Sequence, residues 1–190
     1  MRPLTVLTLT GSLRKASLNT AMLRMAADCA PIGLQLVLHR GLGDLPPFNP
    51  DLELHEPQSV QSLRAKLTSA DALLIASPEY AHGVSGVMKN ALDWMVGSGV
   101  FVDKPVVLKN ASPRATHALA ALRETLTVMS ARLLDGAGLE LLIRSPEAGM
   151  PPLNPDPPAM RRSLLVLRDI LCAERQAAVA AEVAVTHAAS

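Results

Sequence analysis

The sequence predicts a doubly wound α/β domain, in which a parallel β-sheet carries helices on both faces. Short apolar runs alternate along the chain with longer segments whose apolar residues recur at helical spacing. The short runs are almost continuously apolar, as expected of strands that are buried on both faces. With 190 residues, of which 49% are apolar, the chain has the size and composition of one domain with a single core.

The first predicted strand is Leu4–Thr10, and Gly11 closes it. The apolar spacing then becomes helical, and the predicted helix face carries Leu18, Met22, Met25 and Cys29. Leu34–His39 is the second predicted strand. We interpret residues 41–57, which are rich in Gly and Pro, as a loop.

The alternation continues through the middle of the chain. A second helix is indicated by Val60, Leu63 and Leu67. The third predicted strand, residues 71–76, ends at Ser77 and Pro78. A third helix follows, and its apolar face carries Val84, Met88, Ala91 and Met95. Pro105–Lys109 is the fourth predicted strand.

The last third of the chain completes the predicted sheet. A fourth helix is predicted from the spacing of Leu119, Leu122, Leu126, Met129 and Leu133, and residues 139–143 form the fifth strand. Residues 145–158 are a Pro-rich loop, and a last helix has Leu164, Leu167 and Leu171 on one face. Residues 177–190 either extend that helix or fray, so residues 1–190 are treated as one domain.

Ligands of such sheets bind beyond the carboxyl ends of the strands, which directs attention to the loops after strands one, three and four. The first loop opens directly into a helix, whose free N–H groups favour an anion such as a terminal phosphate. Ser12, Ser17 and Asn19 add short donors there, and Arg14 adds a planar cation suited to phosphate. The spacing matches neither a P-loop nor G-x-G-x-x-G, and an ordinary N-cap at Ser17 is the alternative.

The loop after the third strand, residues 77–86, contains Tyr80, the only tyrosine of the chain. Gly83 in this loop permits close approach of the backbone to a flat ligand. In the helix that follows, Lys89 and Asp93 have the i, i+4 spacing of a surface ion pair. Trp94 is interpreted as a core or subunit-interface residue.

Two motifs resemble those of the NADPH-dependent FMN reductase family: Gly11-Ser12-Leu13-Arg14 with Ser17 and Asn19, and the segment 77–94. The resemblance implies a flavodoxin-like fold with strand order 2-1-3-4-5. It implies that the FMN 5′-phosphate is held by Ser12, Arg14, Ser17 and Asn19. It also implies that the flavin ring is lined by Pro78, Glu79, Tyr80, His82 and Gly83. Ser112, in the loop after strand four, is a further expected contact, and Ser85 stands where the family commonly has proline.

By the same resemblance, the chain is expected to be an enzyme that passes a hydride from NADPH or NADH through N5 of FMN to a small-molecule acceptor, in a ping-pong cycle. The acceptor classes are quinones, azo and nitro compounds, flavins and oxidised metal ions. No catalytic side chain is required, because the cofactor carries the chemistry. The family resemblance also implies a homodimer or homotetramer.

Two other functions share this topology. A non-enzymatic electron carrier of flavodoxin type remains the alternative, although the near-neutral charge of the chain and the segment 77–94 favour the reductase. A signalling receiver domain is excluded, because it needs an acidic pair after strand one and an aspartate after strand three. Those positions hold Thr10-Gly11 and Ser77-Pro78.

The composition excludes several further classes. The net charge of +1 and the aromatic content of 2% give no basis for binding nucleic acid or an anionic membrane surface. We expect a cytoplasmic protein without a membrane span. We predict no metal site, because the Cys and His residues are scattered. Cys29 and Cys172 are interpreted as small buried apolar residues, and the histidines outside the candidate loops as surface residues: His39, His55, His117 and His187.

Overall fold

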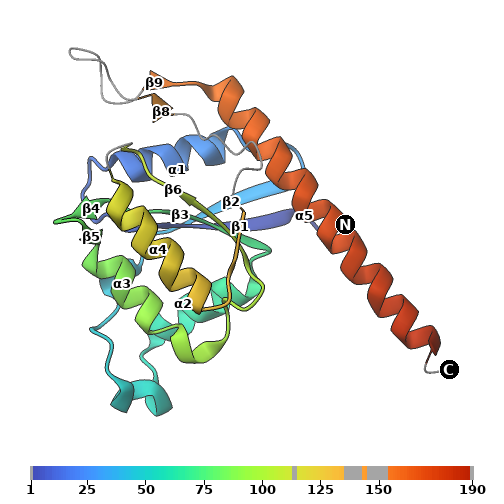
Figure 1. The fold of residues 1–190 in the computed structure, drawn as a ribbon, viewed down its shortest axis with the longest axis horizontal. Helices are drawn as coiled ribbons and strands as arrows, with labels where there is room; N and C mark the ends of the chain where they lie inside the picture. The colour runs from blue at the N-terminus through green and yellow to red at the C-terminus, as the bar shows by residue number, and fades with distance from the viewer. Residues whose placement is uncertain (1, 113–114, 135–142, 145–153, 189–190) are drawn as a thin grey trace.

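The computed structural model describes residues 2–112, 115–134, 143–144 and 154–188. Its main sheet has five strands in the order β2-β1-β3-β6-β7, and all neighbouring strands are parallel (Figure 1). The strands are β1 (Leu4–Thr10), β2 (Leu34–His39), β3 (Ala72–Ala76), β6 (Pro105–Lys109) and β7 (Arg132–Leu133). The predicted doubly wound, flavodoxin-like sheet is therefore confirmed.

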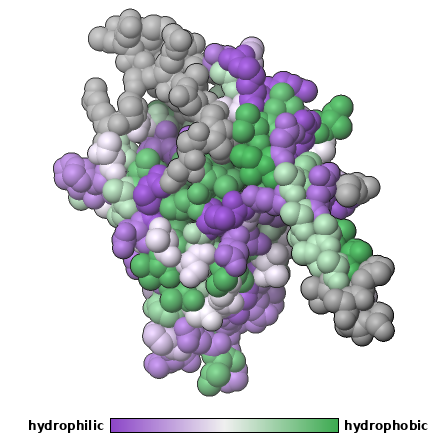
Figure 2. Space-filling model, turned by 45° about the vertical axis from the view of Figure 1, so that its right-hand side comes forward, coloured by the Kyte–Doolittle hydropathy of each residue, from purple (hydrophilic) through white to green (hydrophobic). Residues whose placement is uncertain are grey.

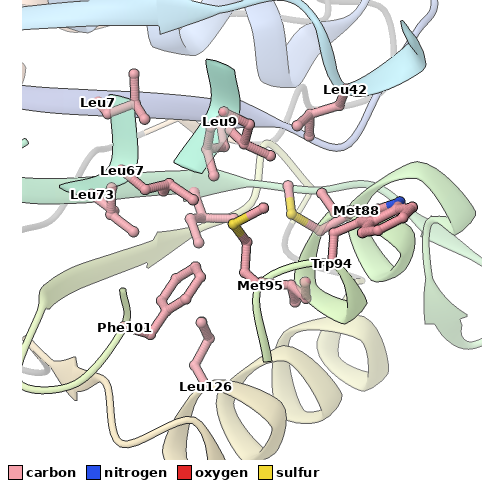
Figure 3. Close-up of a cluster of buried hydrophobic side chains, with 14 of the residues drawn as sticks. Leu7, Leu9, Leu42, Leu67, Leu73, Met88, Trp94, Met95, Phe101 and Leu126 are labelled. Carbon is pink, nitrogen blue, oxygen red and sulfur yellow. The ribbon is translucent and has the colours of Figure 1, made fainter. Parts of the chain in front are cut away.

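Helices cover both faces of this sheet. The first face carries α1 (Leu18–Asp28) and α5 (Pro157–Ala188), and the second carries α2 (Gln58–Ser69), α3 (Gly86–Asp93) and α4 (Thr116–Val128). Successive strand residues point to opposite faces, so Leu7 and Leu9 of β1 pack towards α2, α3 and α4 (Figure 3), while Val6 packs towards α1 and α5. Two apolar cores, one on each face, hold the sheet in place.

Short elements lie outside the main sheet. A hairpin of β4 (Glu79–Tyr80) and β5 (Gly83–Val84) follows β3, and β8 (Ile143–Arg144) pairs with β9 (Asn154–Pro155). Three 3₁₀ segments are η1 (Leu42–Asp44), η2 (Pro50–His55) and η3 (Val96–Ser98). The predicted helical position of Val84 is wrong, because Val84 pairs with Glu79 in the hairpin and α3 begins only at Gly86.

The fifth strand differs from the prediction. Leu133 was expected to continue the fourth helix, but α4 ends at Val128 and Leu133 lies in β7. Ser130 has a φ of +60°, and the N–H of Ala131 donates to the carbonyl of Leu126, which is the Schellman arrangement that terminates a helix. Most of the predicted strand at 139–143 lies outside the described residues, and Ile143 belongs to β8.

The buried face of α1 is rotated relative to the prediction. Its buried residues are Asn19, Met22, Leu23 and Ala26, whereas Leu18 is exposed. The rotation turns the polar side chain of Asn19 inwards. The polar pattern of the sequence did not reveal this, because an apolar stripe starting at Leu18 fits the helical period equally well.

The last helix is tied to the amino edge of the sheet. Asp71, just before β3, accepts a paired hydrogen bond from Arg2 and a further one from Arg175 of α5. Beyond this point α5 projects from the body (Figures 1 and 2), and it carries the exposed side chains of Val179 and Val183. Residues 177–188 therefore extend the helix, and much of the predicted Pro-rich loop, 145–153, lies outside the described residues.

The predictions for the thiols and histidines are confirmed only in part, because the two thiols are half-buried rather than buried. Cys29 and Cys172 are half-buried free thiols beside the core formed with α1 and α5. His55 and His117 are exposed, as predicted. His39 is buried, so its assignment to the surface is wrong: it ends β2 beneath Gly41. The side chain of His187 lies outside the described residues.

The described residues show neither a membrane span nor a metal-binding cluster. None of their helices is both long enough and apolar enough to span a bilayer. Nor do they contain a group of three or more His, Cys, Asp or Glu side chains that could hold a metal ion.

Candidate functional site

A cavity of about 350 Å³ lies at the carboxyl edge of β1, β3 and β6. Three loops form its walls, and these are the loops that follow the three strands. The lining residues are Ser12, Arg14, Ala16, Ser17, Leu18, Asn19, Pro78, Glu79, Tyr80, Asn110, Ala111, Ser112 and Ala115. The cavity thus occupies the switch point between β1 and β3, where ligands of such sheets bind.

The first wall is the loop from Gly11 into α1. Ser17 caps the helix by accepting a hydrogen bond from the N–H of Thr20, so the alternative interpretation of Ser17 as an N-cap is correct. A capping role uses the hydroxyl oxygen and leaves the hydroxyl proton available to a ligand. The exposed guanidinium of Arg14 stands on the same wall, so a cation and a helix N-terminus face one space.

The close packing of this loop depends on Gly11. A Cβ atom placed at Gly11 would lie 2.3 Å from Oγ of Ser77 and 2.6 Å from Oγ of Ser85. The two serine hydroxyls are 3.3 Å apart and share a hydrogen bond. The start of the first loop is therefore pressed against the second loop, and Ser85, the departure from the family pattern, is part of that contact.

Asn19 connects the first wall to the third. Its side-chain oxygen accepts a hydrogen bond from the N–H of Ala111 at 2.8 Å. With the oxygen engaged, the NH₂ group of the amide is the donor that remains for a ligand. Asn110 stabilises the same loop by accepting from the N–H of Ser112.

The second wall is the β4–β5 hairpin. Its two central residues, Ala81 and His82, both have positive φ, 48° and 59°, as in a type I′ turn. Residues other than glycine adopt this conformation at a cost of roughly 1–3 kcal/mol each, so surrounding contacts must hold the turn. The ring of His82 packs edge-on against that of His117, with 4.3 Å between centroids.

Glu79 anchors the hairpin to α4. One carboxylate oxygen accepts a hydrogen bond from the N–H of Ala118 at 2.9 Å, and the other lies 3.1 Å from Nδ1 of His82. The N–H bond from Ala118, reinforced by His82, holds the pKa of Glu79 below its ordinary value. The carboxylate thereby caps the first turn of α4, which has no side-chain cap of its own at Ala115.

Helix α3 is attached to the loop that contains Pro46 and Phe48. The indole of Trp94 is buried, donates to the carbonyl of Pro46 at 2.8 Å and packs edge-on against Phe48. Asn90 also donates to Pro46, and its oxygen accepts from the N–H of Phe48. Trp94 is thus a core residue, as predicted. Lys89 and Asp93 form the expected surface ion pair.

The structure brings together most of the predicted site residues. Those that line the cavity are Ser12, Arg14, Ser17, Asn19, Pro78, Glu79, Tyr80 and Ser112. His82 and Gly83 lie beside it in the hairpin, and neither lines it. The lining residues that the sequence did not reveal are Ala16, Leu18, Asn110, Ala111 and Ala115. Their side chains are small, apolar or amide groups in loops, and such residues carry no chemical signal in a single sequence.

The arrangement can bind an anionic group and a flat ring together. Hydroxyls, a cation and a helix N-terminus meet on one wall, while Pro78 and the half-exposed Tyr80 stand on another. No pair of carboxylates or nucleophile–base pair lines the cavity within the described residues. These features suit the terminal phosphate and ring system of a mononucleotide such as FMN, which brings its own redox chemistry.

A parallel sheet of this order, with a cavity at the carboxyl edge beside the loop after β1, defines the class of flavodoxin-like α/β proteins. Within that class the chain belongs to the NADPH-dependent FMN reductase family, whose model matches residues 4–138. It is 35% identical over 136 residues to the NAD(P)H-dependent FMN reductase of Pseudomonas aeruginosa, a match that covers 68% of this chain and 73% of the relative.

Other relatives have related names. The chain is 42% identical over 109 residues to an NADPH:quinone oxidoreductase of Arabidopsis thaliana, covering 54% of this chain and 55% of the relative. The matched part thus spans only about half of that relative. Among solved structures, the flavoenzyme FerB of Paracoccus denitrificans, an NAD(P)H:(acceptor) oxidoreductase, aligns with a TM-score of 0.65 and 33% identity, over 70% of this chain and 75% of FerB.

Proposed function

We propose that the protein is a cytoplasmic, FMN-dependent NAD(P)H oxidoreductase that reduces small-molecule acceptors, with quinones as the first class to test. The observation that carries this proposal is the meeting of the loop after β1 and residues 78–80 in one cavity. The names of the relatives, which include quinone oxidoreductases and FMN reductases, support the same activity. Azo and nitro compounds, flavins and oxidised metal ions are the other acceptor classes.

We assign the phosphate of FMN to Ser12, Arg14, Ser17 and Asn19, which share one wall. The ring would lie along Pro78, Glu79, Tyr80, His82 and Gly83, with Ser112 at its pyrimidine edge. When bound, FMN supplies the hydride chemistry, accepting from NAD(P)H at N5 and then reducing an acceptor that takes the same place, in a ping-pong cycle. The protein would bind and orient these partners, and the bond from the Ala118 N–H to Glu79 would hold the hairpin in place against α4.

The phosphate assignment is tested with one matched pair of variants. Arg14 lines this cavity, whereas its neighbour Lys15 does not. Removing the charge in Arg14→Gln should weaken FMN binding at least about tenfold, because a charged hydrogen bond to phosphate is lost. Lys15→Gln should bind FMN nearly as the wild type does. Equal FMN affinity of the two variants in a fluorescence titration would show that the phosphate lies elsewhere.

The activity is tested by steady-state oxidation of NADPH and NADH with a quinone acceptor. The expected result is FMN-dependent turnover with parallel initial-rate lines, the signature of a ping-pong cycle. If the yellow, FMN-loaded protein shows no turnover above free FMN, an electron carrier is the better description. If the protein binds no FMN at all, the central proposal fails.

We further propose a homodimer or homotetramer. The projecting part of α5, with exposed Val179 and Val183, is a face that a second copy would cover. Light scattering of the purified protein measures the assembly directly. A monomer at micromolar concentration would contradict this proposal and would leave the assignment of the FMN site unaffected.

A further inference from the structure

A second cavity, of about 180 Å³, adjoins the first. Its lining residues are Thr10, Ser12, Leu13, Arg14, Lys15, Thr20, Arg24, His39, Arg40 and Leu42. Ser12 and Arg14 belong to both cavities. Because β2 and β3 flank β1 on opposite sides, the second cavity lies on the β2 side of the loop and the FMN cavity on the β3 side.

The lining of this second cavity is strongly cationic. It contains Arg14, Lys15, Arg24 and Arg40, and no carboxylate. None of the four is in an ion pair with another described residue. In a chain whose net charge is only +1, this is a local concentration of positive charge. Like charges gathered around a concave space repel one another, and an anion between them removes that repulsion.

The histidine in the wall is an independent observation that points to a ligand. His39 is only 7% exposed, and its Nε2 is buried without a hydrogen-bond partner among the described residues. Its Nδ1 lies 3.5 Å from Nζ of Lys66, and an ammonium group can only donate, so Nδ1 is the acceptor. Burial and the charge of Lys66 lower the pKa of His39, and the smaller effect of Asp44 opposes them. The lowered pKa favours the neutral ring. The single ring proton is then on Nε2.

A buried N–H group without an acceptor is unfavourable and rare in folded proteins. His39 lines this cavity, whose other polar groups are cations and the hydroxyls of Thr10, Ser12 and Thr20, and it also lines a neighbouring cavity together with Asp44 and Lys66. The hydroxyls of Thr10 and Thr20 share one hydrogen bond, so the donors that remain for an oxyanion are chiefly the cations and the hydroxyl of Ser12. The cavity is too small for a whole dinucleotide but large enough for a phosphate group.

We propose that this second cavity binds a phosphate monoester dianion, separately from the phosphate of FMN. Two ligands carry this group: the 2′-phosphate of NADPH, whose remainder would extend outside the cavity, and free phosphate. The first source rests on the proposed function, whereas the second does not. Arginine recognises phosphate through paired hydrogen bonds, and Arg24 and Arg40 line this cavity but not the first one.

The test uses FMN-loaded protein, so that the first cavity is filled, and follows heat on titration with NADP⁺, NAD⁺ and orthophosphate. The variant is Arg24→Gln/Arg40→Gln, and the control is Arg162→Gln, which removes an exposed cation of α5. If the 2′-phosphate is the ligand, NADP⁺ binds at least about tenfold more tightly than NAD⁺, and the double variant removes this difference. If free phosphate is the ligand, orthophosphate binds, and the double variant weakens that binding about tenfold or more.

Two results would overturn the proposal. One is that neither NADP⁺ nor orthophosphate shows binding that the double variant weakens. The other is that orthophosphate binds only to FMN-free protein and is displaced by FMN, which would place it in the first cavity.

The FMN affinity of each variant is measured in parallel. Normal FMN binding without a second phosphate site refutes only this inference, whereas absence of FMN binding by the wild type refutes the proposed function. In that case, orthophosphate titration of the purified protein still tests the second cavity.

Discussion

The side-chain oxygen of Asn19 accepts a hydrogen bond from the backbone N–H of Ala111 at 2.8 Å, and both groups are buried. The two residues are 92 positions apart in the chain. The bond joins the start of α1 to the loop after β6, across the carboxyl edge of the sheet. The wall formed by the start of α1 and the wall formed by the loop after β6 are therefore joined directly.

Two substitutions at Asn19 should separate its structural role from its binding role. Asn19→Ala removes the acceptor and leaves the Ala111 N–H unpaired, at a cost of about 1–3 kcal/mol, so both stability and FMN affinity fall. Asn19→Asp keeps an acceptor oxygen but places a negative charge beside the phosphate wall. Its melting temperature should stay closer to the wild-type value, while FMN affinity drops at least about tenfold. Wild-type FMN affinity in Asn19→Asp, measured by flavin fluorescence, would rule out a phosphate next to this side chain.

Gly11 is predicted to be the glycine of this site that least tolerates a side chain. In Gly11→Ala the new Cβ would meet the Ser77 side chain at 2.3–2.9 Å, so the two loops must separate. We expect a loss of about 1–3 kcal/mol in the free energy of unfolding, as for other overpacked positions, together with weaker FMN binding. Gly86→Ala is the matched control, since a Cβ there meets nothing within 4 Å. Chemical denaturation should show Gly86→Ala as stable as the wild type or more so. Equal stability of the two variants would contradict this account.

The sequence predicted the central strands well because they are buried on both faces. Almost every residue of β1 and all of β3 are buried, and the apolar residues of each strand fall on both faces, so no choice of face was needed. The fifth strand could not be found in the same way. It consists only of Arg132–Leu133. The left-handed backbone at Ser130 ends α4 before this strand, and a serine in the sequence does not predict that conformation.

The candidate site was predictable where the chemistry resides in side chains, as at Arg14 and Tyr80. It was not predictable where main-chain contacts form the wall, as at Ala111. The burial of His39 was also missed, since a histidine at the end of a strand has no sequence feature that distinguishes a buried ring from an exposed one. Only the fold brings Gly41 and Lys66 against it.

Glu79 should matter first as a cap of α4 and only then as part of the flavin wall. Glu79→Ala removes the acceptor for the Ala118 N–H and releases the hairpin turn at Ala81 and His82, so the melting temperature should fall. Glu79→Gln retains an amide oxygen for that N–H and should melt near the wild-type temperature. The comparison is made by thermal unfolding with and without FMN. If Glu79→Gln melts as low as Glu79→Ala, the charge of the carboxylate is what stabilises the hairpin.

Asp71 should make the stability of the protein sensitive to acid. Burial alone would raise the pKa of its carboxyl, but hydrogen bonds from the Thr5 N–H, Arg2 and Arg175 outweigh burial and lower that pKa below its ordinary value. For a carboxyl whose pKa is lower in the folded state, the stabilisation is fully present above the ordinary aspartate pKa of about 4 and is lost as the pH falls through the folded-state pKa. Acid should therefore weaken the attachment of α5.

The measurement is the free energy of unfolding of Asp71→Asn and the wild type between pH 7 and pH 3. At pH 7 the variant should be less stable by about 2 kcal/mol, the typical effect of losing hydrogen bonds to a charged group. The difference should shrink towards pH 3, because below about pH 4 the unfolded wild-type chain takes up a proton that the folded carboxylate resists. Asp169→Asn is the control: its carboxylate is 65% exposed and pairs only with the adjacent Arg168 among the described residues, so it should change stability little at any pH. A stability difference for Asp71→Asn that does not change with pH would mean that packing at this position, rather than the carboxylate charge, fastens the helix to the sheet.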